Sequence, residues 1–133
     1  MHIPGLCLDG DPSGLPWRAT ADPGVHWLPL HLEESASPGA KRGGATVLIR
    51  MDPGRGYAPH RHLGGEDVLV LSGAYRDEFG EYRQGEHVHY PPGSTHAPVA
   101  LGEAGRPVGP LNPACVLFAV APLGIELEPR PSK

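Results

Sequence analysis

The stretch Gly54–Gly73, GRGYAPHRHLGGEDVLVLSG, combines turn glycines with short runs of strand character that carry metal-ligand side chains. Side chains of a strand alternate between its two faces, so His60 and His62 point the same way. After the glycine-pair turn, Glu66 shares its face with the valines of the run that follows, and Asp67 lies on the other face. Glu66, rather than Asp67, is therefore the carboxylate expected beside the two imidazoles.

A second stretch, Gly85–His96 or GEHVHYPPGSTH, adds a third imidazole. His96 follows the rigid Pro-Pro-Gly turn, where it can close the set from a separate strand. The alternative is a group of surface histidines with an ordinary exposed glutamate. The spacing favours metal ligation on several independent counts, because three imidazoles and one carboxylate form a mixed nitrogen and oxygen site for a divalent ion. The predicted metal ligands are His60, His62, Glu66 and His96.

The composition predicts an all-β fold. The 133 residues, 39% of them hydrophobic, suit one domain with one core. The 19 glycines and 17 prolines leave no uninterrupted stretch longer than eight residues, whereas an average helix needs about 11–12. Between these turn residues lie eight runs of strand character: Val25–His31, Ala45–Met51, Asp67–Ser72, Ala74–Phe79, Glu86–Tyr90, His96–Leu101, Val116–Val120 and Gly124–Glu128. A sandwich or barrel is expected.

Charge and sequence patterns exclude some classes of partner and indicate the location and the domain bounds of the chain. The formal net charge of −4 and the lack of a basic block argue against nucleic acid and anionic membranes. No apolar run is long enough to span a bilayer, and the start lacks the pattern of a leader, so a cytoplasmic location is expected. The two cysteines have no paired spacing, which gives no support for a disulfide scaffold. We expect an arm at 1–16, a barrel at 17–128 and a tail at 129–133.

The two stretches together resemble the motifs of the cupins, which are small β-barrels. The first motif reads Gly54, His60, His62, Glu66 and Gly73, and the second reads Gly85, Pro91, Gly93 and His96, with every spacing kept. One departure is Ala100, where many cupins have asparagine. The resemblance implies a double-stranded β-helix, or jelly-roll barrel, with one divalent metal ion per chain.

Within the cupins, the chain looks like the domain appended to zinc-dependent anti-sigma factors and the small iron cupins that cleave β-diketones. The stretches Gly64–Gly73, Asp77–Tyr82 and Tyr90–His96 carry this likeness, and Trp17 and Gly24–Leu30 fit it. It implies either a small non-haem dioxygenase acting on a diketone or aromatic-type molecule, or a non-enzymatic metal-binding sensor. An octahedral ion keeps positions open for substrate, whereas a tetrahedral zinc site with four protein ligands is closed. A metal-free epimerase or binding protein fits the full ligand set poorly.

The metal and the oligomeric state stay open at this level. Iron, zinc, manganese and nickel all suit the donor set, with Fe(II) and Zn(II) favoured. The partner expected is a small-molecule substrate or ligand. The resemblance and the exposed strand edges also point to a homodimer.

Other polar and aromatic residues receive more ordinary interpretations. His87 and His89 should point outward if Val88 points into the barrel, and Cys115 should be a buried, inert thiol. Asp77, Glu78 and Glu81 surround a hairpin tip and are expected to face solvent. The candidates to line a cavity are Arg50, Tyr57, Tyr75, Phe79, Val88, Tyr90 and Phe118.

Overall fold

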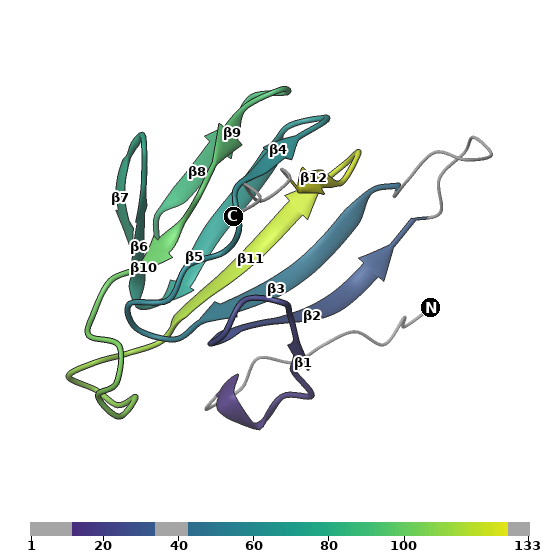
Figure 1. Ribbon diagram of the computed structural model, residues 1–133. Helices are drawn as coiled ribbons and strands as arrows, with labels where there is room; N and C mark the ends of the chain where they lie inside the picture. Colours follow the sequence, from purple (N-terminus) through teal and green to yellow (C-terminus); the bar gives the residue numbers. More distant parts are fainter. Residues whose placement is uncertain (1–11, 34–42, 128–133) are drawn as a thin grey trace, which may run out of the picture.

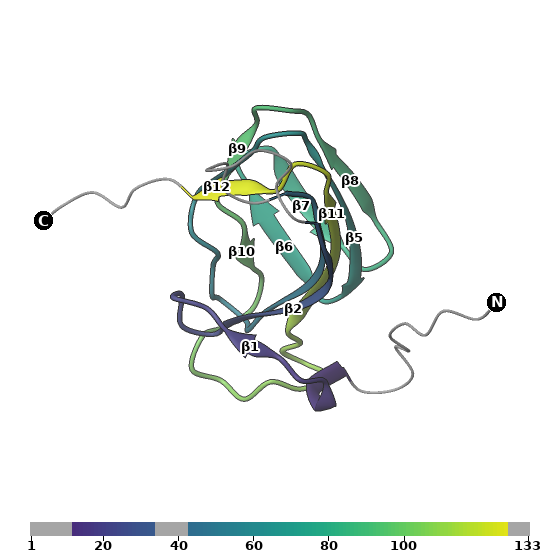
Figure 2. The same cartoon turned by 90° about the vertical axis from the view of Figure 1, so that its right-hand side faces the viewer.

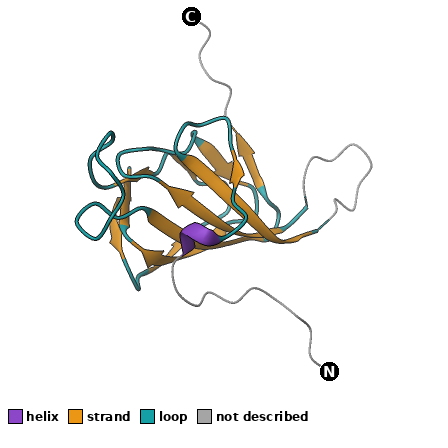
Figure 3. Ribbon diagram, turned by 90° about the horizontal axis from the view of Figure 1, so that it is seen from below, coloured by secondary structure: helices purple, strands orange, loops and turns teal. Residues whose placement is uncertain are grey.

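A computed structural model describes residues 12–33 and 43–127, which are almost entirely strands and turns (Figures 1 and 3). The elements are η1 (Pro12–Gly14), β1 (Arg18–Ala19), β2 (Val25–Leu32), β3 (Ala45–Met51), β4 (His60–His62), β5 (Glu66–Ser72), β6 (Ala74–Asp77), β7 (Gly80–Arg83), β8 (His87–Tyr90), β9 (Thr95–His96), β10 (Val99–Ala100), β11 (Cys115–Ala121) and β12 (Ile125–Leu127). Most of the expected arm 1–16 and the expected tail 129–133 lie outside the described residues. Among the residues that are described, no helix has the length and apolar character to cross a membrane.

Three antiparallel sheets enclose one interior. The largest has the strand order β1-β2-β3-β11-β5-β8, and the smaller ones have the orders β10-β6-β7 and β12-β4-β9. The view in Figure 2 shows these strands wrapping around a common centre. In the large sheet, β11 lies between β3 and β5, so strands far apart in sequence form the wall together. The expected all-β barrel is confirmed.

Three of the described strands lie outside the eight runs predicted from the sequence, and they are short or polar. Strands β1, β4 and β7 contain two to four residues and have no apolar alternation that would mark them as strands. The run expected at Ala74–Phe79 ends as a strand at Asp77. Its carboxylate Oδ1 accepts hydrogen bonds from the backbone N–H groups of Phe79 (2.8 Å) and Gly80 (3.2 Å). These two bonds turn the chain into the hairpin that leads to β7.

Alternation along the strands places polar ligand-type residues inside an apolar core. On β5, Glu66, Val68 and Val70 are buried while Asp67 is exposed, and on β4 both histidines are buried. The core cluster consists of Val25, Met51, Val68, Val70, Tyr75, Tyr90, Ala100, Cys115, Leu117 and Ala119. The interior therefore has one apolar part and one part rich in imidazole.

Gly73 is required by a close backbone approach between β5 and the start of β11. Its φ is +68°, and a Cβ atom at this position would clash with the carbonyl oxygen of Ala114. Gly85 also has a positive φ, +87°, but a Cβ there would meet no atom within 4 Å. Alanine at Gly85 would therefore cost only the left-handed backbone conformation, whereas alanine at Gly73 would cost that and a steric clash.

We predict that Gly85→Ala lowers the free energy of unfolding by roughly 1–2 kcal/mol, which is the cost of the left-handed conformation alone. Gly73→Ala should lower it by at least about 3 kcal/mol, because the carbonyl of Ala114 must also move. Urea unfolding of both variants measures the difference. Equal losses would contradict the close approach at Gly73.

Candidate metal centre

Strand pairing and one turn bring the four predicted ligands together. Strand β4 carries His60 and His62 on its buried face, and its antiparallel pairing with β9 places His96 directly opposite His60. The glycine turn after β4 then returns the chain so that Glu66 opens β5. One potential ligand atom from each of the four side chains lies within 4.8 Å of the others. All four residues are buried, with at most 7% of their surface exposed.

Hydrogen bonds hold the Nδ1 atom of each ring on the side away from this cluster. His60 Nδ1 lies 2.9 Å from the carbonyl oxygen of Ala58, and His62 Nδ1 lies 3.1 Å from Ser94 Oγ. His96 Nδ1 lies 2.9 Å from Asp77 Oδ2. The Nε2 atoms of all three rings are consequently left to face the centre of the cluster.

The proton positions make this centre favourable for a cation. A carbonyl and a carboxylate only accept hydrogen bonds, so His60 and His96 must both carry their proton on Nδ1. Their Nε2 atoms, 3.0 Å apart, then present two lone pairs to each other. A metal ion between them would turn this repulsion into coordination.

His62 and Glu66 support the same conclusion. His62 Nε2 is buried and has no hydrogen-bond partner, although it lies 3.3 Å from Glu66 Oε1. Leaving a buried polar atom without a partner costs about 1–3 kcal/mol. A cation at the centre of the cluster would satisfy both the nitrogen and the carboxylate oxygen, so the donor set fits a divalent ion.

Burial also keeps imidazoles in the form that binds metal. Burial lowers the pKa of His60 to about 4, and burial likewise lowers the pKa of His96. Both rings are therefore neutral at pH 7 with a lone pair available, as metal ligation requires.

A cavity lies beside the cluster and has a largely apolar wall. It is open to solvent, and the space in and in front of it totals about 560 Å³. The residues that line it are Trp27, Ala45, Val47, Ile49, Tyr57, His60, Glu66, Ala119, Ala121, Gly124 and Ile125. A smaller hollow that shares Tyr57 and His60 with this cavity reaches Met51, Tyr75, His96 and Leu117. The Tyr57 ring packs edge-on against His60, with 5.0 Å between ring centroids. A small molecule in the larger cavity would touch two of the four candidate ligands.

Of the seven residues predicted as cavity candidates, Tyr57 and Tyr75 line these spaces. The other five do not, namely Arg50, Phe79, Val88, Tyr90 and Phe118. On β3 and β11, Ile49 pairs with Leu117 and faces inward, so Arg50 and Phe118 take the opposite face. The lining residues Trp27, Val47 and Ala119 belong to runs that sequence marks as strands, but sequence does not tell which face of each run points inward.

The prediction that Asp77 faces solvent is wrong. Its side chain is completely buried, and besides His96 it binds the hydroxyl of Tyr90, whose proton it accepts at 2.5 Å. Burial alone would raise the pKa of Asp77, but the hydrogen bonds from Tyr90, His96 and the Phe79 N–H outweigh it and lower the pKa. Glu78 and Glu81 are exposed as expected. No sequence pattern distinguished Asp77, since only the fold of the hairpin directs it inward.

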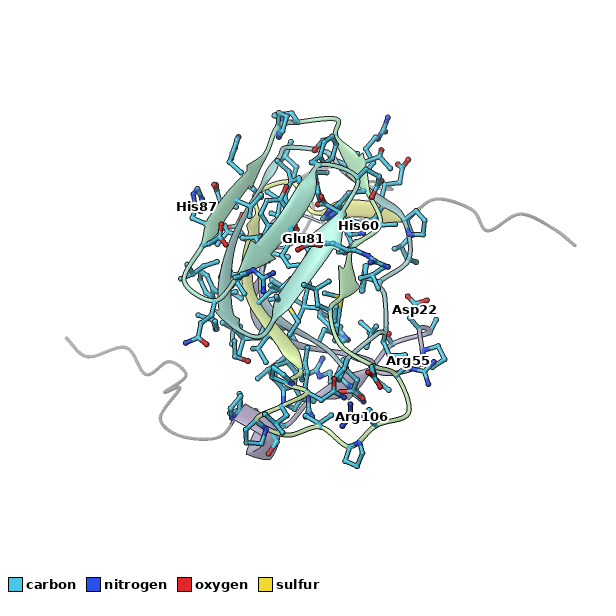
Figure 4. The ribbon with its side chains drawn as sticks, turned by 90° about the vertical axis from the view of Figure 1, so that its left-hand side faces the viewer. Asp22, Arg55, His60, Glu81, His87 and Arg106 are labelled. Atoms are coloured by element: carbon cyan, nitrogen blue, oxygen red, sulfur yellow. The ribbon has the colours of Figure 1, made fainter. Side chains whose placement is uncertain are left out.

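The outward orientation of His87 and His89 is confirmed. Both rings are exposed, and each binds Oδ1 of Asp67 on the neighbouring strand, at 2.9 and 3.0 Å. Figure 4 shows His87 on the outer side of the barrel, whereas His60 lies within its outline. Cys115 is buried as expected, and burial raises the pKa of its thiol to about 12.

Comparison with known proteins now identifies the family. A family model described as the ChrR cupin-like domain matches residues 10–106. The chain belongs to this family of cupins. Comparison with curated proteins gives no match.

Solved structures similar to this chain include an anti-sigma factor and acetylacetone dioxygenases. The anti-sigma factor ChrR of Rhodobacter sphaeroides, in complex with SigE, is 25% identical with a TM-score of 0.62, covering 84% of this cupin and 50% of ChrR. This cupin thus spans about half of the ChrR chain. An acetylacetone dioxygenase from Acinetobacter johnsonii is 14% identical with a TM-score of 0.64, covering 96% of this chain and 80% of its own. A putative acetylacetone dioxygenase from Methylibium petroleiphilum, also 14% identical with a TM-score of 0.64, covers 97% and 86%. At that identity the dioxygenases share the fold alone.

We predict that His62→Ala reduces bound metal from about one ion per chain to near zero, because the variant loses a buried donor. Its melting temperature should fall and no longer respond to added metal, since an ion stabilises only a fold that binds it. Elemental analysis and thermal melts measure both effects.

His89→Ala is the matched control, because it removes a histidine from the other His-x-His pair, on the outer face. It should keep full metal content. If His62→Ala keeps its metal, or if both variants lose it equally, the proposed ligand set is wrong.

Proposed function

We propose that this chain is a small non-haem metal-dependent dioxygenase that cleaves a diketone or aromatic-type small molecule, with the metal held by His60, His62, Glu66 and His96. The observation that carries this proposal is the cavity beside the cluster, because His60 and Glu66 form part of its wall. An ion bound by the four side chains would therefore face a space for a small molecule. A purely structural zinc site has no need of such a space.

One divalent ion per chain is proposed, with Fe(II) and Zn(II) favoured over Mn(II) and Ni(II). When bound, the ion would supply Lewis acidity and, in the case of iron, a route for electrons to dioxygen. A homodimer and a cytoplasmic location stay predictions.

The cavity wall selects the chemistry of the substrate. Beyond the candidate ligands, the described lining residues are aliphatic, aromatic or glycine, and they include no lysine, arginine or aspartate. An anionic group in the body of the substrate would lose its hydration there without gaining an ion pair. The oxygens of the substrate should therefore face the metal ligands, while an uncharged hydrocarbon part lies along Val47, Ile49 and Ala119.

We expect metal analysis of untagged protein purified without chelator to find about one Fe, Mn, Ni or Zn per chain. The iron-loaded protein should consume dioxygen with at least one member of a panel of β-diketones, catechols and flavonols. His62→Ala treated identically is the blank for free iron. Absence of dioxygen uptake across the panel by protein with a full iron content would overturn the dioxygenase proposal.

The cavity wall offers a test that leaves the ligands intact. Ala119 is buried on the inner face of β11 and lines both hollows, so leucine there would fill substrate space. We predict that Ala119→Leu lowers kcat/KM at least about tenfold, equivalent to about 1.4 kcal/mol, while metal content stays near that of the wild type. Val120→Leu, on the outer face of the same strand, should change kcat/KM less than about threefold. Equal effects of the two substitutions would contradict the placement of the substrate.

A second candidate function is a non-enzymatic metal-binding regulatory module. It is favoured by the match to the ChrR cupin-like family and by the 25% identity to ChrR itself. This function predicts a zinc ion without an exchangeable water and a protein partner whose binding changes with ligand or oxidant. Stoichiometric zinc that persists after iron reconstitution, together with no dioxygen uptake, would favour it over the dioxygenase.

A further inference from the structure

We propose that Asp77 is a positioning residue for the metal centre: its carboxylate fixes the proton of His96 on Nδ1 and so keeps Nε2 free to bind the ion. This inference rests on the metal binding in the proposed function, but not on the dioxygenase reaction. It gives a role to the one buried carboxylate, outside the cluster itself, that touches a candidate ligand among the described residues.

The carboxylate of Asp77 is held by four donors. Oδ1 accepts the backbone N–H groups of Phe79 and Gly80, while Oδ2 accepts His96 Nδ1–H and the Tyr90 hydroxyl. With all four bonds made and no surface exposed, the carboxylate cannot rotate without breaking at least two of them. The direction in which Oδ2 points is therefore fixed by the hairpin turn itself.

The tyrosines behind Asp77 extend this network into the core. The hydroxyls of Tyr75 and Tyr90 lie 2.7 Å apart. Because the single hydroxyl proton of Tyr90 goes to Asp77, Tyr75 must donate to Tyr90. The ring of Tyr90 also packs against His96, with 4.3 Å between centroids. His96 is thus restrained at its nitrogen and along its face.

His96 differs in this respect from the other two histidines of the cluster. Nδ1 of His60 meets a backbone carbonyl, and Nδ1 of His62 meets a hydroxyl. A carboxylate on the far nitrogen makes imidazole a stronger metal donor than a neutral acceptor does. Together with Glu66, Asp77 also brings two negative charges to a divalent cation in a buried site, which balances its charge.

The substitution Asp77→Asn makes the role testable because its geometry is constrained. The two backbone N–H groups of the hairpin require an oxygen at the Oδ1 position, so the amide nitrogen must take the position of Oδ2. An N–H donor would then face His96 Nδ1, which becomes the acceptor and moves the ring proton to Nε2. With the proton on Nε2, this atom of His96 has no lone pair available to bind the metal.

The matched control is Glu78→Gln. Glu78 is the neighbouring carboxylate on the same hairpin, and its Oε1 accepts the backbone N–H of Ala97 at 3.0 Å rather than a ligand side chain. The substitution removes one negative charge from the same hairpin tip without a contact to any of the four candidate ligands. It therefore measures how much a general weakening of the hairpin affects the site.

The first experiment measures Zn²⁺ affinity by competition with a chromophoric chelator. Asp77→Asn should weaken binding about 10–100-fold, and Glu78→Gln less than about threefold. Tyr90→Phe, which keeps the carboxylate but removes one of its donors, should fall between them and covers the case in which Asp77→Asn does not fold. Equal weakening by Asp77→Asn and Glu78→Gln, or none by Asp77→Asn and Tyr90→Phe, would overturn the inference.

The second experiment reads the His96 proton directly in metal-free protein, by ¹⁵N NMR of the histidine rings. The wild type should carry the proton on Nδ1 and Asp77→Asn should carry it on Nε2. An unchanged tautomer would overturn the inference even if metal affinity falls. If the wild type bound no metal at all, the proposed function would fail as well; if it binds metal as tightly as Asp77→Asn does, only the role of Asp77 fails.

Discussion

Burying three imidazole rings and a carboxylate side by side is the constraint on which the rest of this structure depends. The Nδ1 atom of each ring has a hydrogen-bond partner outside the cluster, so the three Nε2 atoms face the centre of the cluster. The Nε2 atoms of His60 and His96 come close together there. Without a cation, lone pairs would oppose each other at 3.0 Å, and His62 Nε2 would lack any partner. A divalent metal ion at the centre would satisfy all four donors together, so this arrangement in the core could hold one.

The two sides of the barrel around the cluster differ in structure. On the side of Tyr75 and Tyr90, packed rings and hydrogen bonds hold His96 in place through Asp77. The side of β3 and β11 is built from smaller aliphatic residues, including Ala119, and leaves the cavity. The centre thus has a rigid support on one side and room for a ligand on the other. The same fold serves an anti-sigma factor and dioxygenases, so this difference between the two sides carries more functional information than the fold does.

The sequence predicted well that the four side chains lie together, because its signals are local. Two histidines separated by one residue must share a strand face, and the fixed spacing of Glu66 and His96 from glycine and proline turns limits where they can lie. The prediction failed at Asp77 for the opposite reason. A carboxylate beside a Phe-Gly hairpin tip normally faces water, and only the packing of that hairpin against β9 and Tyr90 directs it to His96.

By itself, the sequence determined that the chain is all-β, that it carries the cupin motifs, and that His60, His62, Glu66 and His96 are candidates for one site, because alternation and turn chemistry act over a few residues. Only the tertiary structure decided which strand faces point inward, that Ala119 and Val47 rather than Phe118 and Arg50 line the cavity, and that a core tyrosine pair supports Asp77. Those features depend on the register between strands far apart in the chain, and a register is set by the packing of the whole barrel rather than by any one segment.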